Sequence, residues 1–377
     1  MADVVIVRAS VGIYDPRVYK IASSLSKRYS VLVLGWNREI EKKPVKRYIV
    51  DVEQLNFKTP YGKPDTIHLT YMLSYFAIFW AWVFIRLIRH NPKVVHACDL
   101  DVVLPCFLYK LIFRKKLVFD VFDRYAMTFI PATSKILYSA VNSIEELFSK
   151  YADVLITISE KSLNTFRKKP KNSAIIMNYA TDVASDFQNL HEHEDKKDNA
   201  LRLVYTGGIK KGRCLENITV AINNLKGVEL IIAGMIVDKE LFDQIISIPN
   251  VKYRGSLYPK DCLVLEANAD VMIAIYDLKV YWNSITTANK IFEAMMCSIP
   301  IITNVSPELV KKLDFGIMVD YDNIAEIREA IILLRDNADL RENLGSNGRK
   351  AFLEKYNWTK MEERLFQIYE DLVKEYN

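Results

Sequence analysis

The 377-residue sequence is poor in cysteine and glycine, and neither sign of charge dominates it. Its five cysteines form no close pair and have no histidine at zinc-ligand spacing, which argues against a disulfide framework or a zinc knuckle and favours a reducing compartment. The 12 glycines are about half the usual share, so we expect few long irregular loops. Lys and Arg number 51 against 46 Asp and Glu, and no arginine-rich tract is present, which argues against nucleic-acid binding.

The start of the sequence lacks the features of a signal peptide. No cationic segment precedes the apolar residues 4–7, and no cleavage site follows them. We interpret this segment as a first strand and expect a cytoplasmic protein. Hydrophobic residues make up 50% and charged residues 26% of the chain, a globular composition that excludes disordered and multi-span membrane proteins.

Short β-branched runs alternate with longer amphipathic segments in both halves of the chain, and several runs are apolar on both faces, as buried parallel strands are. The first half predicts strands at residues 4–7, 31–34, 94–96, 117–121, 154–158 and 174–177. The second half predicts strands at residues 203–206, 228–233, 251–253, 271–275 and 300–303. This alternation predicts an α/β fold with two doubly wound parallel-sheet domains, which bind ligands at the carboxyl ends of their strands.

A polar segment without periodicity, residues 188–200, separates the two halves and is interpreted as a linker. We therefore expect an N-terminal domain at residues 1–187, a C-terminal domain at residues 201–358 and a last helix at residues 359–377. Thr359 and Glu362 have the spacing of a capping box at the start of that helix.

The first motif that points to chemistry follows the strand at residues 203–206. Gly207 and Gly208 allow the backbone to approach a ligand closely, and the next helix begins where an anion is favoured. Lys210, Lys211 and Arg213 add positive charge at the same end. A glycine turn with a purely structural role explains this stretch equally well.

A second motif lies at residues 284–300, where Thr286 or Thr287 can cap a helix. Asn289 and Glu293 are four residues apart and share one face of it. A carboxylate one turn inside the helix, here Glu293, can accept both hydroxyls of a ribose, while the free amides ahead of it face a diphosphate. The alternative is a solvated Glu and Lys on an ordinary amphipathic helix.

With these motifs the sequence resembles the family-4 retaining glycosyltransferases of the GT-B fold. The most specific match is the segment 289–300, which contains Glu293-Ala294-Met295 and ends at Pro300. Three further segments are similar to that family: residues 15–18 with Lys20, residues 95–99, and Trp358 with Tyr369. The resemblance implies two Rossmann-like domains that face a cleft, with the last helix crossing back to complete the N-terminal, acceptor-side domain.

The resemblance also implies a nucleotide-sugar donor held by the C-terminal domain, with Glu293 on the ribose and Arg213 and Lys211 on the diphosphate. The other donor-binding residues that we expect are Gly207, Gly208, Arg254, Gly255, Tyr258, Asn283, Ser284, Ala288, Asn289 and Lys290. No cofactor is expected beyond this co-substrate, and UDP is slightly favoured over GDP.

Two positions depart from the family pattern. Many members have a second Glu eight residues before Glu293, where this chain has Ile285; Asp277, Asn283 and Ser284 are the candidate substitutes for its sugar contacts. Many also have a His where this chain has Phe122.

The leaving diphosphate needs positive charge, which Arg213, Lys211, Lys290 and two helix N-termini can supply without a metal. The Asp99-Leu100-Asp101 sequence imitates a metal-binding pair, but it lies in the other half, and we expect no metal there. The resemblance implies front-face attack with the departing phosphate as the base. Asp123 is a candidate for orienting the acceptor or for capping a helix. Arg17, Asp99 and Arg124 are candidates for acceptor contacts, and the two arginines are equally well explained as surface charges.

Three apolar, aromatic or basic segments belong to the N-terminal half: residues 69–85, which carry no charge, residues 107–116 and residues 124–138. The first is shorter than the roughly 20 residues that span a bilayer, so it is a buried domain helix or a helix in the membrane interface. We expect peripheral binding to the cytoplasmic face of a membrane and a lipid-linked or glycan acceptor.

These observations predict a retaining hexosyltransferase. Two alternatives stay open. Loss of the family Glu and His is compatible with a non-catalytic homologue that binds nucleotide sugars. A nucleotide-sugar epimerase on the same fold would need acid and base residues around the sugar, and the chain has only five histidines.

Overall fold

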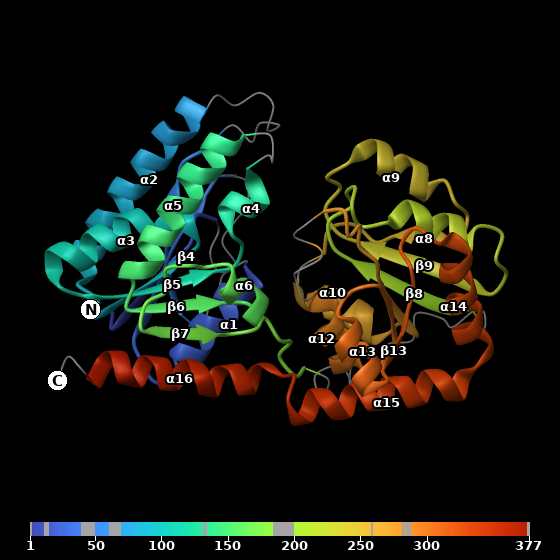
Figure 1. Cartoon of the computed structure of the whole chain (residues 1–377). Coiled ribbons are helices and arrows are strands. Elements are labelled where there is room, and N and C mark those ends of the chain that lie inside the picture. Colours follow the sequence, from blue (N-terminus) through green and yellow to red (C-terminus); the bar gives the residue numbers. More distant parts are fainter. Residues whose placement is uncertain are drawn as a thin grey trace. The chain divides into compact units, whose positions relative to one another are not determined.

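The computed structural model describes residues 2–10, 15–38, 50–59, 69–130, 134–183, 200–257, 259–280, 283 and 288–374. The chain divides into two compact units (Figure 1). The N-terminal unit is Met1–Asn178 together with Met361–Asn377, and the C-terminal unit is Tyr179–Lys360. The predicted linker lies outside the described residues except for Ala200.

The N-terminal unit is built on a parallel sheet that has seven strands among the described residues, in the order β3-β2-β1-β4-β5-β6-β7. Their bounds are β1 Val4–Val7, β2 Val31–Asn37, β3 Asp51–Asn56, β4 Val94–Cys98, β5 Lys116–Val121, β6 Val154–Thr157 and β7 Asn172–Ile175. The central strands β1 and β4 are buried along their whole length, as their unbroken apolar runs predict.

Helices cover both faces of this sheet. The helices of the unit are α1 Pro16–Leu25, α2 Leu69–His90, α3 Leu100–Phe113, α4 Tyr125–Phe129, α5 Lys135–Tyr151, α6 Glu160–Asn164 and most of α16 Trp358–Lys374. On one face, Val95 and Ala97 of β4 share a core with side chains of α2, α3 and α5. The alternating residue His96 points to the other face, where it contacts Tyr369 of α16.

Each end of the chain in this unit shows how local chemistry starts a helix. Asp15 caps α1, because its side chain accepts from the amides of Arg17 and Val18. The predicted capping box of the last helix is wrong. Helix α16 begins one residue earlier, at Trp358, and the Asn357 side chain accepts from the Lys360 amide at 3.4 Å, so Asn357 takes the capping role.

The C-terminal unit has a second parallel sheet, with six strands among the described residues in the order β10-β9-β8-β11-β12-β13. Their bounds are β8 Leu201–Thr206, β9 Val228–Ala233, β10 Val251–Tyr253, β11 Val271–Ala274, β12 Ile301–Thr303 and β13 Gly316–Met318. Both sheets follow the doubly wound pattern, in which the strand order reverses beside the first strand.

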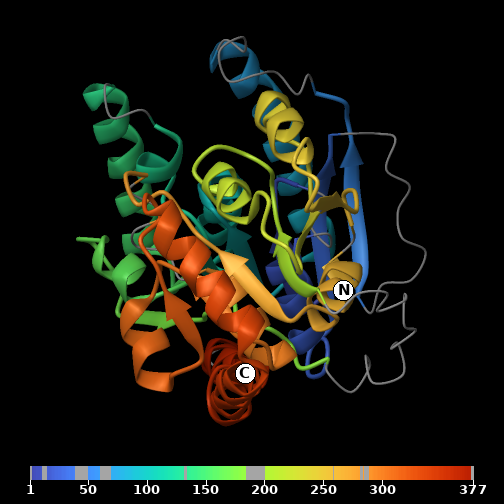
Figure 2. The same cartoon turned by 90° about the vertical axis from the view of Figure 1, so that its right-hand side faces the viewer.

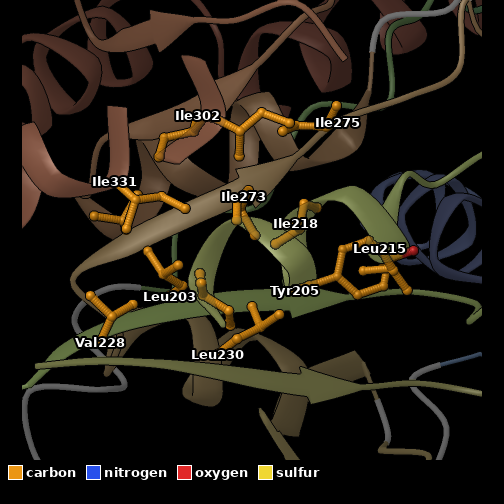
Figure 3. Close-up of a cluster of buried hydrophobic side chains, with 14 of the residues drawn as sticks. Leu203, Tyr205, Leu215, Ile218, Val228, Leu230, Ile273, Ile275, Ile302 and Ile331 are labelled. Atoms are coloured by element: carbon orange, nitrogen blue, oxygen red, sulfur yellow. The ribbon is translucent and has the colours of Figure 1, made fainter. Parts of the chain in front are cut away.

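The helices of this unit are α8 Leu215–Ile222, α9 Lys239–Ile246, α10 Pro259–Ala267, α12 Asn289–Cys297, α13 Pro307–Leu313, α14 Ile324–Asp336 and α15 Ala338–Glu354. Isoleucines and leucines of β8, β9 and β11 pack under α8 and α14 (Figure 3). Helices α10, α12 and α15 pack together on the opposite face, so this sheet too lies between two helical layers (Figure 2).

Candidate functional site

The glycine turn after β8 packs closely against Gly234, which follows the neighbouring strand β9. Gly234 has a φ of 146°, and a Cβ there would lie 1.9 Å from the carbonyl oxygen of Gly207. The Tyr205 hydroxyl donates to the Gly208 carbonyl at 2.9 Å. The turn therefore has a fixed shape at the carboxyl end of the sheet, where doubly wound folds bind ligands.

Two of the predicted cations lie beside this turn. The Arg213 guanidinium carbon is 4.7 Å from the centre of the Tyr276 ring, and the residue is only partly exposed. Lys211 is exposed and lines a cavity of about 180 Å³ next to α8 and α9. The stacked guanidinium has a defined position, whereas Lys211 adds a mobile point charge.

Hydrogen bonds of Asn283 and Asp277, two candidates for sugar contacts, link the loop after β11 to the glycine turn. The Asn283 amide donates to the carbonyls of Asp277 at 2.9 Å and Gly212 at 3.3 Å. The Asp277 amide in turn donates to the Gly212 carbonyl at 3.1 Å. Tyr258, Ser284, Ile285, Thr286 and Thr287 lie outside the described residues.

Helix α12 begins beside this edge, with Ala288 in the capping position. Among the described residues, no side chain makes a capping hydrogen bond to its first turn. The start of a helix favours an anion. Lys290 follows on the first turn and Glu293 at the start of the second, and their side chains are 17% and 20% exposed.

Lys290 and Glu293 form an ion pair with each other, and Lys290 Nζ also donates to Glu266 Oε1 at 2.7 Å. Glu266 is fully buried on α10 and accepts a further hydrogen bond from the Thr206 hydroxyl. Sequence reasoning missed Glu266, although a single acid within the otherwise apolar run of residues 263–267 was a usable signal.

Burial and charge act in opposite directions in this cluster. Burial raises the pKa of Glu266, and the nearby Lys290 only partly offsets the shift. Burial alone would lower the pKa of Lys290, but the carboxylates of Glu266 and Glu293 outweigh it and raise that pKa, so Lys290 stays charged.

The segment after β10 is open to a ligand. Gly255 has a φ of 85°, and a Cβ built on it would meet nothing within 4 Å. Its carbonyl accepts from the Gly234 amide at 2.9 Å, which places Arg254 and Gly255 next to the end of β9. The predicted donor residues all belong to the C-terminal unit and lie at or beyond the carboxyl ends of its strands or near the start of α12: Gly207, Gly208, Arg213, Arg254, Gly255 and Glu293.

The residues proposed for the acceptor have internal partners in the N-terminal unit. Asp99 forms an ion pair with Arg8 and accepts from the amides of Phe122 at 2.7 Å and Asp123 at 3.3 Å. The Phe122 ring lies under two guanidinium groups, with the carbon of Arg8 at 4.6 Å and that of Arg17 at 4.9 Å from its centre. Phe122, which replaces the family histidine, therefore packs against cations.

Arg17 is 3% exposed and makes a two-armed ion pair with Asp120, at 2.8 and 3.2 Å. Asp120 also accepts from His96 Nε2 at 3.2 Å, and Tyr369 contacts the other ring nitrogen at 2.7 Å. Burial would raise the pKa of Asp120, but Arg17 and His96 outweigh it, and the pKa lies below its ordinary value.

Arg124 is fully buried, at 3.3 Å from Glu145 and 3.5 Å from Glu146, and its guanidinium lies 3.7 Å from the centre of the Phe166 ring. Acceptor contacts by Arg17, Asp99 and Arg124 stay a prediction, but each of these side chains already has a charged partner within the unit. Asp123 is half-buried at the end of β5. Among the described residues, no group of three or more His, Cys, Asp or Glu side chains has a metal-binding arrangement.

A second feature is the outward side of α2, α3 and α5, which we call the apolar face. Twelve large hydrophobic side chains on these neighbouring helices are at least 38% exposed: Ile78, Ile85, Ile88, Leu108, Leu111, Ile112, Phe113, Ile136, Leu137, Ile144, Leu147 and Tyr151. The described aromatic side chains of α2 instead pack in or against the core, where Phe79 stacks on Trp36 at 4.9 Å. No described helix is both long and apolar enough to cross a membrane.

Residues 200–337 match the family model described as "Glycosyl transferases group 1". This match lies within the C-terminal unit. An uncharacterized glycosyltransferase of Methanocaldococcus jannaschii is 24% identical over 289 residues, which cover 72% of this chain and 73% of that protein. A second one from the same organism is 36% identical over 83 residues, or 21% of this chain and 23% of that protein.

Solved structures of the same fold extend the likeness along both units. Sucrose-phosphate synthase from Thermosynechococcus elongatus has a TM-score of 0.76 at 13% identity and covers 98% of this chain and 99% of its own. HepE from Anabaena, solved with UDP and glucose, has a TM-score of 0.73 at 15% identity and covers 98% and 100%. The chain has the GT-B fold.

Proposed function

We propose that the chain is a retaining glycosyltransferase that moves a hexose from a nucleoside diphosphate sugar to a lipid-linked or glycan acceptor. The observation that carries this proposal is the edge of the C-terminal sheet. There, the glycine turn, Arg213 and the start of α12 with Glu293 all lie within the residues matched by the group 1 model.

The proposed catalysis is electrostatic. As the bond between the sugar and the diphosphate breaks, negative charge grows on the phosphate oxygens, and Arg213, Lys211 and the first amides of α12 stabilise it. Preorganised donors of this kind typically contribute about 3 kcal/mol each to lowering a barrier. We propose that no metal is needed, so chelation with EDTA should leave the rate unchanged.

For retention of configuration, the departing phosphate takes the proton of the acceptor hydroxyl. The acceptor oxygen then bonds to the anomeric carbon on the face that the phosphate leaves. This route needs no dedicated base and leaves Asp123 to orient the acceptor. We favour UDP over GDP as the nucleotide, which is supported by the fold neighbour HepE, solved with UDP and with UDP-glucose.

The test is to incubate the full chain with UDP- and GDP-hexoses, with and without vesicles that carry polyprenyl diphosphate sugars or free oligosaccharides. Nucleotide release that depends on the acceptor, with a product of unchanged anomeric configuration by NMR, is expected. A changed sugar without an acceptor would indicate an epimerase. Bound nucleotide without release under any condition would indicate a non-catalytic homologue.

We also propose that the apolar face binds the surface of an anionic membrane, which would bring the enzyme to a lipid-linked acceptor. Large exposed apolar areas are rare on monomeric proteins unless a partner covers them. Here four exposed basic residues lie on or at the ends of the same helices, Arg89, Arg114, Lys135 and Lys150. Aliphatic side chains can enter the interface while basic side chains meet the lipid phosphates.

Co-sedimentation with vesicles that contain phosphatidylglycerol tests this second proposal. Replacing Ile85 and Ile112, which are 63% and 62% exposed, by Glu should lower the bound fraction at least tenfold. Leu333→Glu is the matched control, because Leu333 is 46% exposed on α14 of the other unit. Equal sedimentation of all three proteins, or none with the unmodified chain at low salt, would contradict membrane binding by this face.

A further inference from the structure

Glu266 has no role in the proposed chemistry, yet it is the most deeply buried carboxylate of the C-terminal unit's candidate site. It comes from α10, accepts from Thr206 at the end of β8, and contacts Lys290 on α12. It therefore links three separate elements, β8, α10 and α12, and its contact on α12 is Lys290 of the first turn.

The arrangement costs stability, which points to a function. Among the described residues nothing donates a hydrogen bond to Glu266 Oε2, although this atom is buried. An apolar residue or a glutamine would avoid burying an unsatisfied carboxylate oxygen. In this arrangement the Glu266 carboxylate accepts a hydrogen bond from the Lys290 ammonium group and fixes its position.

Lys290 in turn restrains the side chain of Glu293. The Lys290 ammonium group donates to Glu293 Oε2 across one turn of α12 and to Glu266 on α10. The pair of carboxylates offsets the charge of Lys290, so this residue is poorly suited to act as a free cation for a diphosphate. The contact uses Oε2 of Glu293 and leaves Oε1 to accept from a ligand.

We infer that Glu266 is a positioning residue for ribose recognition: with Thr206 it anchors Lys290, and Lys290 holds Glu293 in the orientation that accepts the ribose hydroxyls. This inference rests on the proposed nucleoside diphosphate site. It assigns Lys290 to the orientation of Glu293 instead of to the phosphates.

Calorimetric titration of the full chain with UDP and GDP, and with their 2′-deoxy and 3′-deoxy forms, tests the inference. A hydrogen bond to a carboxylate should make the unmodified chain prefer the ribose form by about tenfold or more for at least one hydroxyl. In Glu266→Ala this preference should fall below about threefold. Glu266→Gln keeps an oxygen for Thr206 and Lys290 but loses the charge, and it should give an intermediate preference.

Thr206→Val removes the second anchor and provides a further variant should Glu266→Ala not fold. Asp261→Asn, an exposed carboxylate on the same helix, is the control and should keep the full preference. A purely structural role would weaken ribose and deoxyribose forms equally, and that result, or an unchanged preference in both Glu266 variants, overturns the inference. If the unmodified chain binds neither UDP nor GDP, the proposed function itself fails.

Discussion

Arg213 is the side chain whose loss should affect turnover most. Its guanidinium is stacked on Tyr276 beside the glycine turn, so it is held where negative charge would grow on a leaving diphosphate. We expect Arg213→Ala to lower turnover by about a hundredfold or more while the melting temperature stays unchanged. Nucleotide release measures the effect, and Lys239→Ala, which removes a 72% exposed cation of the same unit, is the control. A full rate in Arg213→Ala would remove this residue from the site.

Asp120 gives the N-terminal unit a stability that depends on pH. Its pKa lies below the ordinary value in the folded state, so the ionised carboxylate stabilises the fold above that ordinary value, and the contribution disappears as the pH falls through the folded pKa. We expect Asp120→Asn to cost about 3 kcal/mol at pH 7, because it leaves Arg17 buried without its partner charge.

Urea unfolding followed at pH 7 and at pH 3 tests this expectation, with the exposed Asp51→Asn as the control. The difference between Asp120→Asn and the unmodified chain should shrink at the lower pH, because pH 3 lies below the ordinary pKa that Asp120 has in the unfolded chain. A difference that stays constant between the two pH values would show that the carboxylate charge is not the cause.

At the scale of residues, the sequence identified candidate site residues but could not show which of them are buried. It predicted Gly207, Gly208, Arg213 and Glu293, and the structure places them in one unit at the edge where its sheet would bind a ligand. It could not show that the charges of Arg17 and Arg124 have buried partners, because those partners are distant in the chain. Glu266 was missed for the same reason, since only folding brings it to Lys290.

At the scale of elements, the packing of α15 against α12 depends on one glycine. A Cβ on Gly345 would lie 2.1 Å from the Ser298 carbonyl oxygen at the end of α12. We expect Gly345→Ala to destabilise the C-terminal unit by about 2 kcal/mol through this collision, although alanine favours a helix by up to about 1 kcal/mol. Thermal unfolding measures the change.

Ser346→Ala is the control for this prediction, because Ser346 is exposed on the same helix and should change stability by less than about 0.5 kcal/mol. An increase in stability for Gly345→Ala would mean that the two helices can separate slightly at no cost, and it would contradict a tight contact at this position.

Most strands were predictable because buried parallel strands read as short, unbroken β-branched runs. Strands β3 and β13 were missed. β3 is polar and largely half-exposed, and β13 has only three half-buried residues, of which the first is Gly316, so neither carries that signal. The start of α16 was also misplaced, because Asn357 and Thr359 are both acceptable caps and only the observed hydrogen bond distinguishes them.

At the scale of the whole molecule, the alternating order of strands and helices predicted the two parallel-sheet domains, and the last helix links the two units. Helix α16 begins in the C-terminal unit and continues in the N-terminal unit, where Glu362 pairs with Lys27 at 2.7 Å and Tyr369 is fully buried. The sequence also indicated a membrane-binding segment, but it favoured aromatic side chains, whereas the exposed apolar face is mainly aliphatic because the α2 rings fill the core.

The central claim is that the C-terminal unit holds a nucleoside diphosphate through Arg213 and Glu293. Titration of the full chain with UDP and with GDP, repeated with Arg213→Ala and Glu293→Gln, tests it most directly. The account predicts one binding site for at least one of the two nucleotides and a loss of affinity of at least tenfold in each variant. A chain that binds neither nucleotide, or variants that bind as tightly as the unmodified protein, would contradict it.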